Sequence, residues 1–383
     1  MHGIKTNILT EGTRPIAAVA TATIGLIATA TAPAGAATAA LNAAFPLDTP
    51  VLVTDVRSAI GDAGTGGTLK AALEAIADQA SPIVVVVRVA VGADAAAQNA
   101  AVIGTTTAGA YTGAQALLAA EARTGQRPRI IGAPGLDTAA ATAGLVVVAK
   151  KLRAMVYAGV TAATIADAVT YAGTFGDREL MLIWPNFTSG FAGDAVARAL
   201  GLRAAIDESQ GWHKTLSNVV VGGVTGISKD LFFDIQDSTT DVALLNAANV
   251  TTLVRWQGFR FWGNRTTSDE PLFAFESSTR TSQILQDEIA AGLGWAVDKP
   301  LTVRLIRDVL ETINARFRTL KSQGRIIGAR AWYDPALNSA PDLAAGKVVI
   351  DYDFTPAAPL EGLELNQRIT DKYYADFATQ LAA

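Results

Sequence analysis

The chain has 383 residues, of which 50% are hydrophobic and 17% charged, with a net charge of −4 and no cysteine. This length allows a large core and about two to three domains. The composition excludes disulfides and cysteine-ligated metals, disfavours a general nucleic-acid-binding protein, and contains no apolar run of the ~18 residues that a membrane span needs. Interface cores are depleted in charge, so this low charge density favours a chain that buries surface against other subunits.

The first residues of the chain predict one isolated strand. Residues 2–9 alternate between two faces, and the segment ends near the turn-forming residues Gly12 and Pro15. The side chains on one face are Ile4, Thr6 and Ile8. A single strand at a terminus has no sheet of its own, so it invites pairing with another chain.

Residues 14–37 resemble an export signal, because a cation precedes an apolar stretch and small residues follow it. However, Glu11 precedes the stretch and four threonines dilute its apolar core. At a period of two, residues 19–28 fit a strand that is buried on both faces. We therefore favour a strand, and a signal peptide is the alternative.

A strand–helix–strand rhythm begins at residue 51 and is typical of a parallel sheet. Expected strands lie at 51–54, 83–89, 129–131, near 156 and at 180–184. Expected helices lie at 69–79, 113–123, 140–155, 161–171 and 193–207. The sequence from about residue 45 to 255 therefore predicts an α/β domain of the doubly wound, Rossmann-like kind.

A second α+β unit is expected after a transition at residues 263–276. Its clearest element is an amphipathic helix of some twenty residues whose apolar side chains recur at steps of three and four. They are Val303, Ile306, Leu310, Ile313, Phe317 and Leu320. Residues 347–354 then alternate as a half-exposed strand, and a helical turn over 374–381 closes the chain.

No motif predicts a catalytic, cofactor-binding or metal-binding residue. The glycine-rich residues 61–73 have neither the Walker spacing nor the dinucleotide-binding spacing, and we interpret them as a turn and a helix start. His2 and His213 lie far apart in the sequence. The acidic run of Asp230, Asp234, Asp237 and Asp241 lacks calcium-loop spacing and indicates a solvated, turn-rich surface. An enzyme built from scattered carboxylates stays open.

Aromatic and basic residues alternate in "RWQGFRFWGNRT", residues 255–266. One hypothesis is a stacking platform for nucleic acid bases. We favour the other, in which the aromatic side chains fill a core and the arginines connect domains, because the chain is acidic overall.

Several motifs in the same order resemble the contractile tail sheath proteins of myophages and R-type pyocins. They are "HGIKTNILTEGTRPIAAVATATIGLIATA", "AAFPLDTPVLVTD", "PIVVVVRV", "RPRIIGAPG", "LIWPNF", "GFRFWGNRT" and "LEGLELNQRITDKYYADF". The resemblance implies a structural subunit that polymerises as stacked hexameric rings around an inner tube and contracts to drive the tube through a cell envelope. It implies no catalysis and no cofactor.

The same resemblance implies the partners: other copies of the chain, the tail tube protein, and baseplate and tail terminator proteins, with no direct nucleic acid contact and no membrane insertion. The protein would assemble in the cytoplasm of a bacterial host and become part of a virion or a phage-tail-like particle. The alternatives are a Rossmann-like enzyme or small-molecule-binding protein, and an exported surface protein rich in alanine and threonine.

Within this family the chain would divide into four parts. Residues 1–18 would form an N-terminal arm and residues 361–383 a C-terminal arm, both exchanged as strands between subunits. Residues 19–255 would form the outer α/β domain, with 19–30 assignable to either domain, and residues 256–360 the inner, tube-proximal α+β domain. The arm residues are Ile4, Thr6, Ile8, Leu363, Leu365 and Ile369, and the expected hinges are Gly12, Pro15, Pro356 and Pro359.

A row of charged side chains lies beside the apolar stripe of the long helix. Its cations are Arg307, Arg318, Lys321 and Arg325, and Glu311 and Asn314 complete the row. Such a row usually faces water. The resemblance to sheath proteins favours contact with the inner tube instead.

Overall fold

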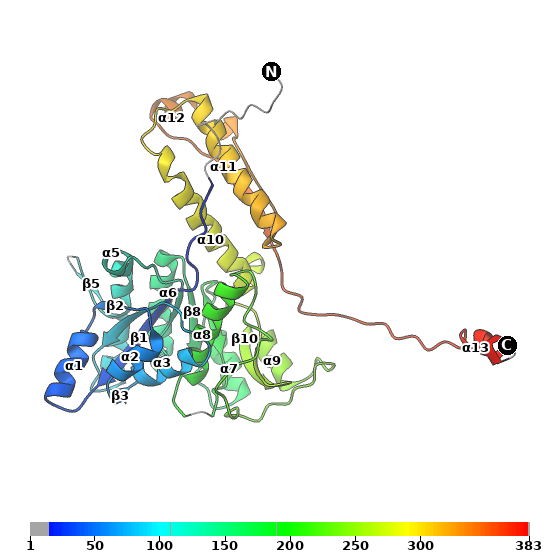
Figure 1. The fold of residues 1–383 in the computed structure, drawn as a ribbon, viewed down its shortest axis with the longest axis horizontal. Helices are drawn as coiled ribbons and strands as arrows, with labels where there is room; N and C mark the ends of the chain where they lie inside the picture. Colours follow the sequence, from blue (N-terminus) through cyan, green and yellow to red (C-terminus); the bar gives the residue numbers. More distant parts are fainter. Residues whose placement is uncertain (1–14, 108, 189, 382–383) are drawn as a thin grey trace, which may run out of the picture.

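The computed structural model describes residues 15–381 except 108 and 189 (Figure 1). An α/β body (residues 24–262) lies below a stalk (residues 276–356), and an extended C-terminal segment (residues 357–381) leaves the foot of the stalk (Figure 1). No helix in these described ranges is long and apolar enough to cross a membrane.

One mixed sheet forms the centre of the body. Within the described ranges its strand order is β11-β10-β9-β8-β7-β1-β4-β2, and β3 pairs with β1. The strands are β1 (Ile24–Thr31), β2 (Pro50–Val53), β3 (Gly66–Gly67), β4 (Val84–Val89), β7 (Ile130–Gly132), β8 (Met155–Gly159), β9 (Leu180–Ile183), β10 (Val250–Arg255) and β11 (Phe259–Trp262). The strands from β10 to β4 run parallel, and β2 and β11 are antiparallel to their neighbours. The predicted parallel α/β sheet is confirmed.

Helices cover both faces of this sheet and form two separate hydrophobic clusters with it. On the first face lie α1 (Ala36–Ala44), α2 (Val56–Asp62), α3 (Leu69–Ala77) and α8 (Asp194–Ser209). On the second face lie α4 (Ala95–Ile103), η1 (Gly113–Ala119), α5 (Ala120–Thr124), α6 (Ala139–Leu152), α7 (Ile165–Ala172) and α9 (Asp241–Ala247). A small hairpin of β5 (Thr106–Thr107) and β6 (Ala110–Tyr111) lies outside the sheet.

Strand β1 is buried on both faces in the middle of the sheet. Leu26 packs into the first cluster and Ile27 into the second, and neither is exposed. Gly25 is required by close packing, because a Cβ atom there would lie 2.9 Å from Cβ of Pro128. The predicted two-faced strand is thus confirmed from Ile24 onward, and it continues to Thr31. The isolated strand expected at residues 2–9 lies outside the described residues.

The stalk packs two long helices and a two-stranded sheet. Its elements are α10 (Glu276–Leu293), η3 (Gly294–Ala296), α11 (Val303–Ser322), β12 (Ile326–Trp332), η4 (Pro335–Leu337), α12 (Ala340–Ala344) and β13 (Asp351–Pro356); η2 (Pro271–Phe273) precedes them and α13 (Tyr374–Leu381) follows. The predicted amphipathic helix is α11. Its stripe buries Ile313, Phe317 and Leu320 against the sheet, and the rings of Phe317 and Tyr352 lie 5.9 Å apart.

Some predicted boundaries are wrong for identifiable reasons. The helix expected at 140–155 ends at Leu152, because Arg153 adopts a left-handed φ of 52° and Met155 already begins β8. The helix expected from residue 161 begins at Ile165, where the side chain of Thr164 caps it. The strand expected at 347–354 runs from Asp351 to Pro356. Helices α1, α2, α4, α9, α10 and α12 were not predicted.

We expect Leu26→Ala and Ile27→Ala each to lower the free energy of unfolding by about 2–5 kcal/mol, because each leaves a cavity in a different cluster. Denaturant unfolding measures this loss. The matched control is Leu365→Ala, whose side chain is exposed and should change stability by less than about 0.5 kcal/mol. If one core variant matched the control, β1 would not be buried on both faces.

Candidate functional site

The glycine-rich loop of residues 61–73 packs against β1 and does not form an anion-binding loop. The N–H groups of Thr65 and Thr68 each donate to a carbonyl oxygen of β1 at 2.9 Å. Gly67 has a φ of 88°, and a Cβ atom there would lie 2.4 Å from the carbonyl oxygen of Thr29. The interpretation as a turn and a helix start is confirmed, since these N–H groups are already used.

Among the described residues, no group of three or more His, Asp or Glu side chains could hold a metal ion. The acidic run instead stabilises local turns, as predicted. Asp234 accepts a hydrogen bond from the N–H of Gln236 at 2.9 Å, and Asp237 accepts one from Thr239 at 2.7 Å. Burial, followed by the charges of Arg325 and Arg203, lowers the pKa of His213.

A hollow of about 250 Å³ lies at the carboxyl ends of β7, β8 and β9, where open α/β sheets usually bind ligands. Burial raises the pKa of Asp137 in this hollow to about 6. However, Asp137 accepts a hydrogen bond from the N–H of Gly159, and the amide of Asn186 bonds to Phe191 and Ala195 at 2.8 Å. These polar groups connect loops to each other, which favours a structural role for the site.

The residues around "GFRFWGNRT" form the β10–β11 hairpin and its exit. Phe261 is fully buried, with its ring 5.8 Å from that of Phe187. Arg260 donates to the carbonyl oxygen of Asn218 at 2.8 Å, and Arg265 binds Glu361 of the C-terminal segment through two hydrogen bonds of 2.9 and 2.6 Å. The core role is confirmed for Phe261, and Arg265 connects the hairpin exit to the C-terminal segment. Arg260 bonds within the body, so these contacts do not show the expected link between domains.

A cluster of fully buried charges connects α8 of the body to α10 of the stalk. Arg203 and Asp207 lie one turn apart on α8, with a contact of 2.8 Å, and Arg203 is 3.2 Å from Glu276 on α10. Asp207 also binds Arg280 of α10, and the Tyr157 hydroxyl donates to Glu276. Each buried charge therefore has an opposite charge on the neighbouring helix.

The electrostatics of this junction follow from burial. Burial, together with the charge of Glu276, raises the pKa of Tyr157 well above its usual value, so the hydroxyl stays a donor. Although burial opposes it, the charges of Asp207 and Glu276 raise the pKa of Arg203. A buried charge that loses its partner costs far more than an exposed one, so these helices are locked to each other.

Helix α10 makes a second set of ionic contacts further along. Asp287 binds Arg129 and Arg153 of the body, and Glu288 binds Arg316 of α11 in a bidentate pair with contacts of 2.9 and 2.5 Å. These contacts connect α10 on one side to the body and on the other to α11. Helix α10 was not predicted because its buried face is mostly polar. Two signals were available: a stretch free of glycine and proline between residues 272 and 291, and Leu285, Ile289 and Leu293 at steps of four.

The cations proposed from sequence on α11 have different surroundings. Arg307, Arg318 and Lys321 are exposed on one flank, and Arg318 binds Glu311 on the same helix. Arg325 lies beyond the helix end, with its guanidinium 4.6 Å from the ring of Trp212. Asn314, which belongs to the same row, instead holds β12 through two hydrogen bonds with Ala331 of 3.0 and 2.9 Å.

The C-terminal segment extends away from the rest of the molecule (Figure 1). Leu363, Leu365 and Ile369 are exposed, the last to 97%, and residues 357–373 form no strand or helix. The two prolines expected as hinges, Pro356 and Pro359, stand where the segment leaves β13. Pro15 is exposed, and the remaining N-terminal arm and hinge residues, Ile4, Thr6, Ile8 and Gly12, lie outside the described residues.

The two-stranded sheet of the stalk has unpaired edges. Among the described residues, β12 pairs only with β13, from Ile326 opposite Pro356 to Trp332 opposite Asp351. Each strand therefore has one edge on which backbone donors and acceptors lack a strand partner. Such edges accept a strand from another chain.

Three family models match the chain: the phage tail sheath protein central domain at residues 109–267, the phage tail sheath C-terminal domain at 268–370, and the tail sheath protein Gp18 domain III N-terminal region at 21–89. The chain is 52% identical to the tail sheath protein of Escherichia phage P2 and 47% identical to the major tail sheath protein of Serratia phage KSP20. Each alignment covers 99% of this chain and 98% of the relative.

Solved structures share the fold. The helical sheath of the anti-feeding prophage in its contracted state matches with a TM-score of 0.70 at 16% identity, covering 96% of this chain and 98% of the other. The sheath complex of an extracellular contractile injection system, PVC, in its contracted state matches with a TM-score of 0.66 at 14% identity, covering 97% and 99%.

We expect Asp207→Asn to destabilise the protein by about 3–5 kcal/mol, because it removes the shared carboxylate of two buried guanidinium groups, Arg203 and Arg280. Urea unfolding measures the change. The control Asp62→Asn removes an exposed carboxylate of α2 and should have almost no effect. A loss below about 1 kcal/mol for Asp207→Asn would show that the junction does not depend on charge pairing.

Proposed function

This chain belongs to the phage tail sheath family, and we propose that it polymerises as stacked hexameric rings around an inner tube and contracts to drive that tube through a cell envelope. It is a structural subunit of a contractile tail sheath and part of a virion or tail-like particle. The carrying observation is the 52% identity to the phage P2 sheath protein along nearly the whole of both chains. We propose that it has no enzymatic role.

The body and the stalk have different positions in the proposed sheath. The body, which we take to be a doubly wound and Rossmann-like domain, faces outward, and the stalk faces the tube. The domain boundary expected between residues 255 and 256 falls inside the β10–β11 hairpin, so we extend the outer domain to residue 262. Parallel strands with helices on both faces support the first assignment. The exposed cations of α11 support the second, because a charged flank can bind a tube and still release it.

The two ends of the chain link subunits by strand exchange. Leu363, Leu365 and Ile369 are exposed in an extended segment, and apolar side chains in that state gain free energy when a partner covers them. The open edges of β12 and β13 offer backbone partners for such a segment, as in β-augmentation. We assign residues 1–18 to the other arm. The described part of this arm begins at the far end of the stalk, where Ile16 lies against Gly292 of α10. The C-terminal segment leaves the stalk at the opposite end (Figure 1).

Contraction moves each subunit as one body. The buried charges between α8 and α10 hold body and stalk together, so the bending falls on Gly12 and Pro15 at one end and Pro356 and Pro359 at the other. Further partners are the tube protein, the baseplate and the tail terminator, with no direct contact to nucleic acid.

The tube contact lies on the flank of α11 that carries Arg307, Arg318 and Lys321, and Arg325 stands at the end of this row. Each exposed pair contributes only about 0.2–1 kcal/mol, so many repeated pairs give a strong grip whose single contacts break easily. This combination suits a sheath that must leave the tube when it contracts.

Deleting residues 363–383 should leave a folded subunit that cannot form a connected sheath, because Leu363, Leu365 and Ile369 are exposed and belong to none of the three described hydrophobic clusters. The same is expected for deletion of residues 2–9. Negative-stain microscopy measures sheath length, and thermal unfolding measures folding. Long sheaths of normal appearance, or loss of the cooperative unfolding transition, would each contradict strand exchange as the function of these segments.

Replacing Arg318 and Lys321 together by Glu should destabilise the extended sheath on its tube and produce early contraction or empty sheaths, with unchanged subunit stability. Electron microscopy of particles gives the fraction that stays extended. The control reverses two exposed cations of the body, Arg57→Glu and Lys70→Glu. Stable extended particles from the α11 variant, even in high salt that screens such contacts, would place the tube contact elsewhere.

A further inference from the structure

Three exposed apolar side chains, which we name the apolar patch, lie at the carboxyl edge of the sheet and away from α11. It consists of Phe232, Ile235 and Leu244, which are 57%, 53% and 58% exposed. The N–H of Phe232 donates to the carboxylate of Asp241 at 2.9 Å, which holds Phe232 against the first turn of α9. Helix α9 also carries Leu244. Exposed apolar side chains gain free energy when a partner covers them, so these three residues are candidates for a contact surface.

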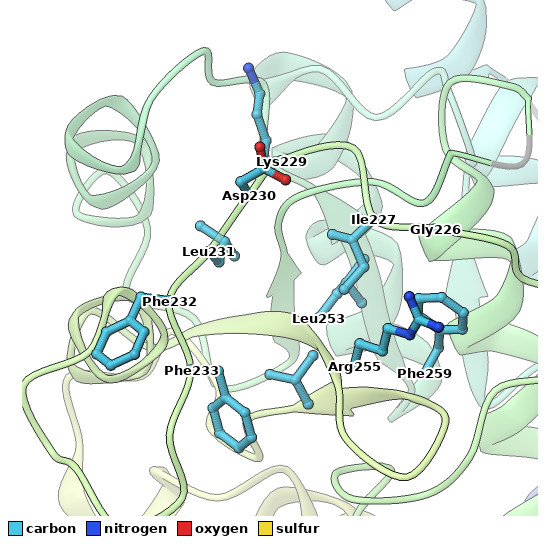
Figure 2. A pocket seen from close by; sticks show the side chains of 11 residues that line it. Gly226, Ile227, Lys229, Asp230, Leu231, Phe232, Phe233, Leu253, Arg255 and Phe259 are labelled. Carbon is cyan, nitrogen blue, oxygen red and sulfur yellow. The ribbon is translucent and has the colours of Figure 1, made fainter.

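The segment that carries the patch has hollows on two sides. Residues 226–233 stand off from β10 and β11 and leave a hollow of about 530 Å³, across which Leu253, Arg255 and Phe259 lie (Figure 2). On the other side lies a second hollow of about 830 Å³, which is lined by residues 233–237, α9 and residues 360–363. The segment therefore makes few contacts with the body on these two sides. A partner can bind it without displacing side chains of the hydrophobic core.

The charges around the apolar patch specify a basic partner. Asp230, Asp234 and Asp237 are all in this segment, and its one cation is Lys229, at the far end (Figure 2). Asp234 is exposed and Asp237 is partly exposed. The nearby Arg265 is already paired with Glu361. Acidic side chains beside aromatic and aliphatic ones complement a surface that presents cations beside an apolar residue.

The chain itself carries such a surface at the end of α6. We define this basic patch as Arg123, Val147 and Lys151, all exposed, and the neighbouring Lys150 is already paired with Asp177 at 2.5 Å. Val147 and Lys151 lie one turn apart on α6. Arg127 connects this helix to α5, because its guanidinium donates to the carbonyl oxygen of Lys151 at 3.5 Å and lies 3.8 Å from Glu121.

The two patches lie at opposite edges of the same sheet. Helix α6 ends at Leu152, directly before β8 begins at Met155, so the basic patch is at the amino ends of the strands. Helix α9 begins at Asp241 and precedes β10, so the apolar patch is at the carboxyl ends. Complementary surfaces on opposite ends of one molecule produce head-to-tail contacts that repeat along a stack.

We propose that the apolar patch of one subunit binds the basic patch of a second copy of the chain. This contact adds a direct interface between α/β bodies to the links made by the arms, and it rests on the proposed function as a self-assembling sheath. Phe232 and Ile235 would pack around Val147, and Asp234 and Asp237 would pair with Arg123 and Lys151.

A charge-swap experiment tests the pairing. The acidic-side variant is Asp234→Lys with Asp237→Lys, and the basic-side variant is Arg123→Glu with Lys151→Glu. Each should raise the protein concentration needed for half-maximal sheath assembly roughly tenfold at low salt, because attraction becomes repulsion at two contacts per subunit. The chain with all four substitutions should assemble nearly as the wild type does. Sedimentation and microscopy measure assembly, and thermal unfolding checks folding.

The matched control for the acidic-side variant is Asp62→Lys with Glu74→Lys. It makes the same charge change as that variant at exposed positions of α2 and α3. Its assembly should equal that of the wild type. If the fourfold variant assembles no better than the two-residue variants, or if either of these assembles normally, the patches do not bind each other. A wild-type chain that forms no sheath at all would instead contradict the proposed function.

Discussion

The pairing of buried charges between α8 and α10 is the interaction on which the architecture depends. Four charged side chains are excluded from water at this junction: Arg203, Asp207, Glu276 and Arg280. Each one is paired with an opposite charge on the other helix, and Arg203 and Asp207 also pair with each other within α8. Separating these helices would leave charges buried without partners, or would require water to enter the junction, and both are costly. The body and the stalk therefore behave as one unit, although each has its own hydrophobic core.

In the proposed function, the changes of contraction fall on the segments that link subunits. The C-terminal segment contacts the remainder of the molecule through Arg265 and Glu361, a partly exposed pair that contributes little and separates easily. On this account, the subunit keeps its shape while its links to neighbours change. The contacts that we propose on α11 and between the two patches of the body are weak and repeated. Such contacts fit an assembly whose interfaces form in one arrangement and are replaced in another.

The sequence predicted those elements whose apolar residues recur at a clear period. Strand β1, strand β4 and the stripe of α11 follow directly from periodicity, because hydrophobic side chains fill both faces of the strands and one face of the helix. Helix α10 was missed, since Glu276, Arg280 and Asp287 look solvated until α8 and the body supply their partners. The open edges of β12 and β13 likewise depend on tertiary structure, whereas the resemblance to sheath proteins came from short motifs in order.

Structures of the same particle before and after contraction, determined by electron cryomicroscopy, test the central claim most directly. The account predicts that residues 24–356 of one subunit superimpose between the two states, with the contacts of Arg203 and Arg280 to Asp207 and Glu276 intact. The chain should change direction only at the arm junctions, near Pro356 and Pro359. A changed angle between α8 and α10, with new partners for these charges and unchanged arm junctions, would contradict it.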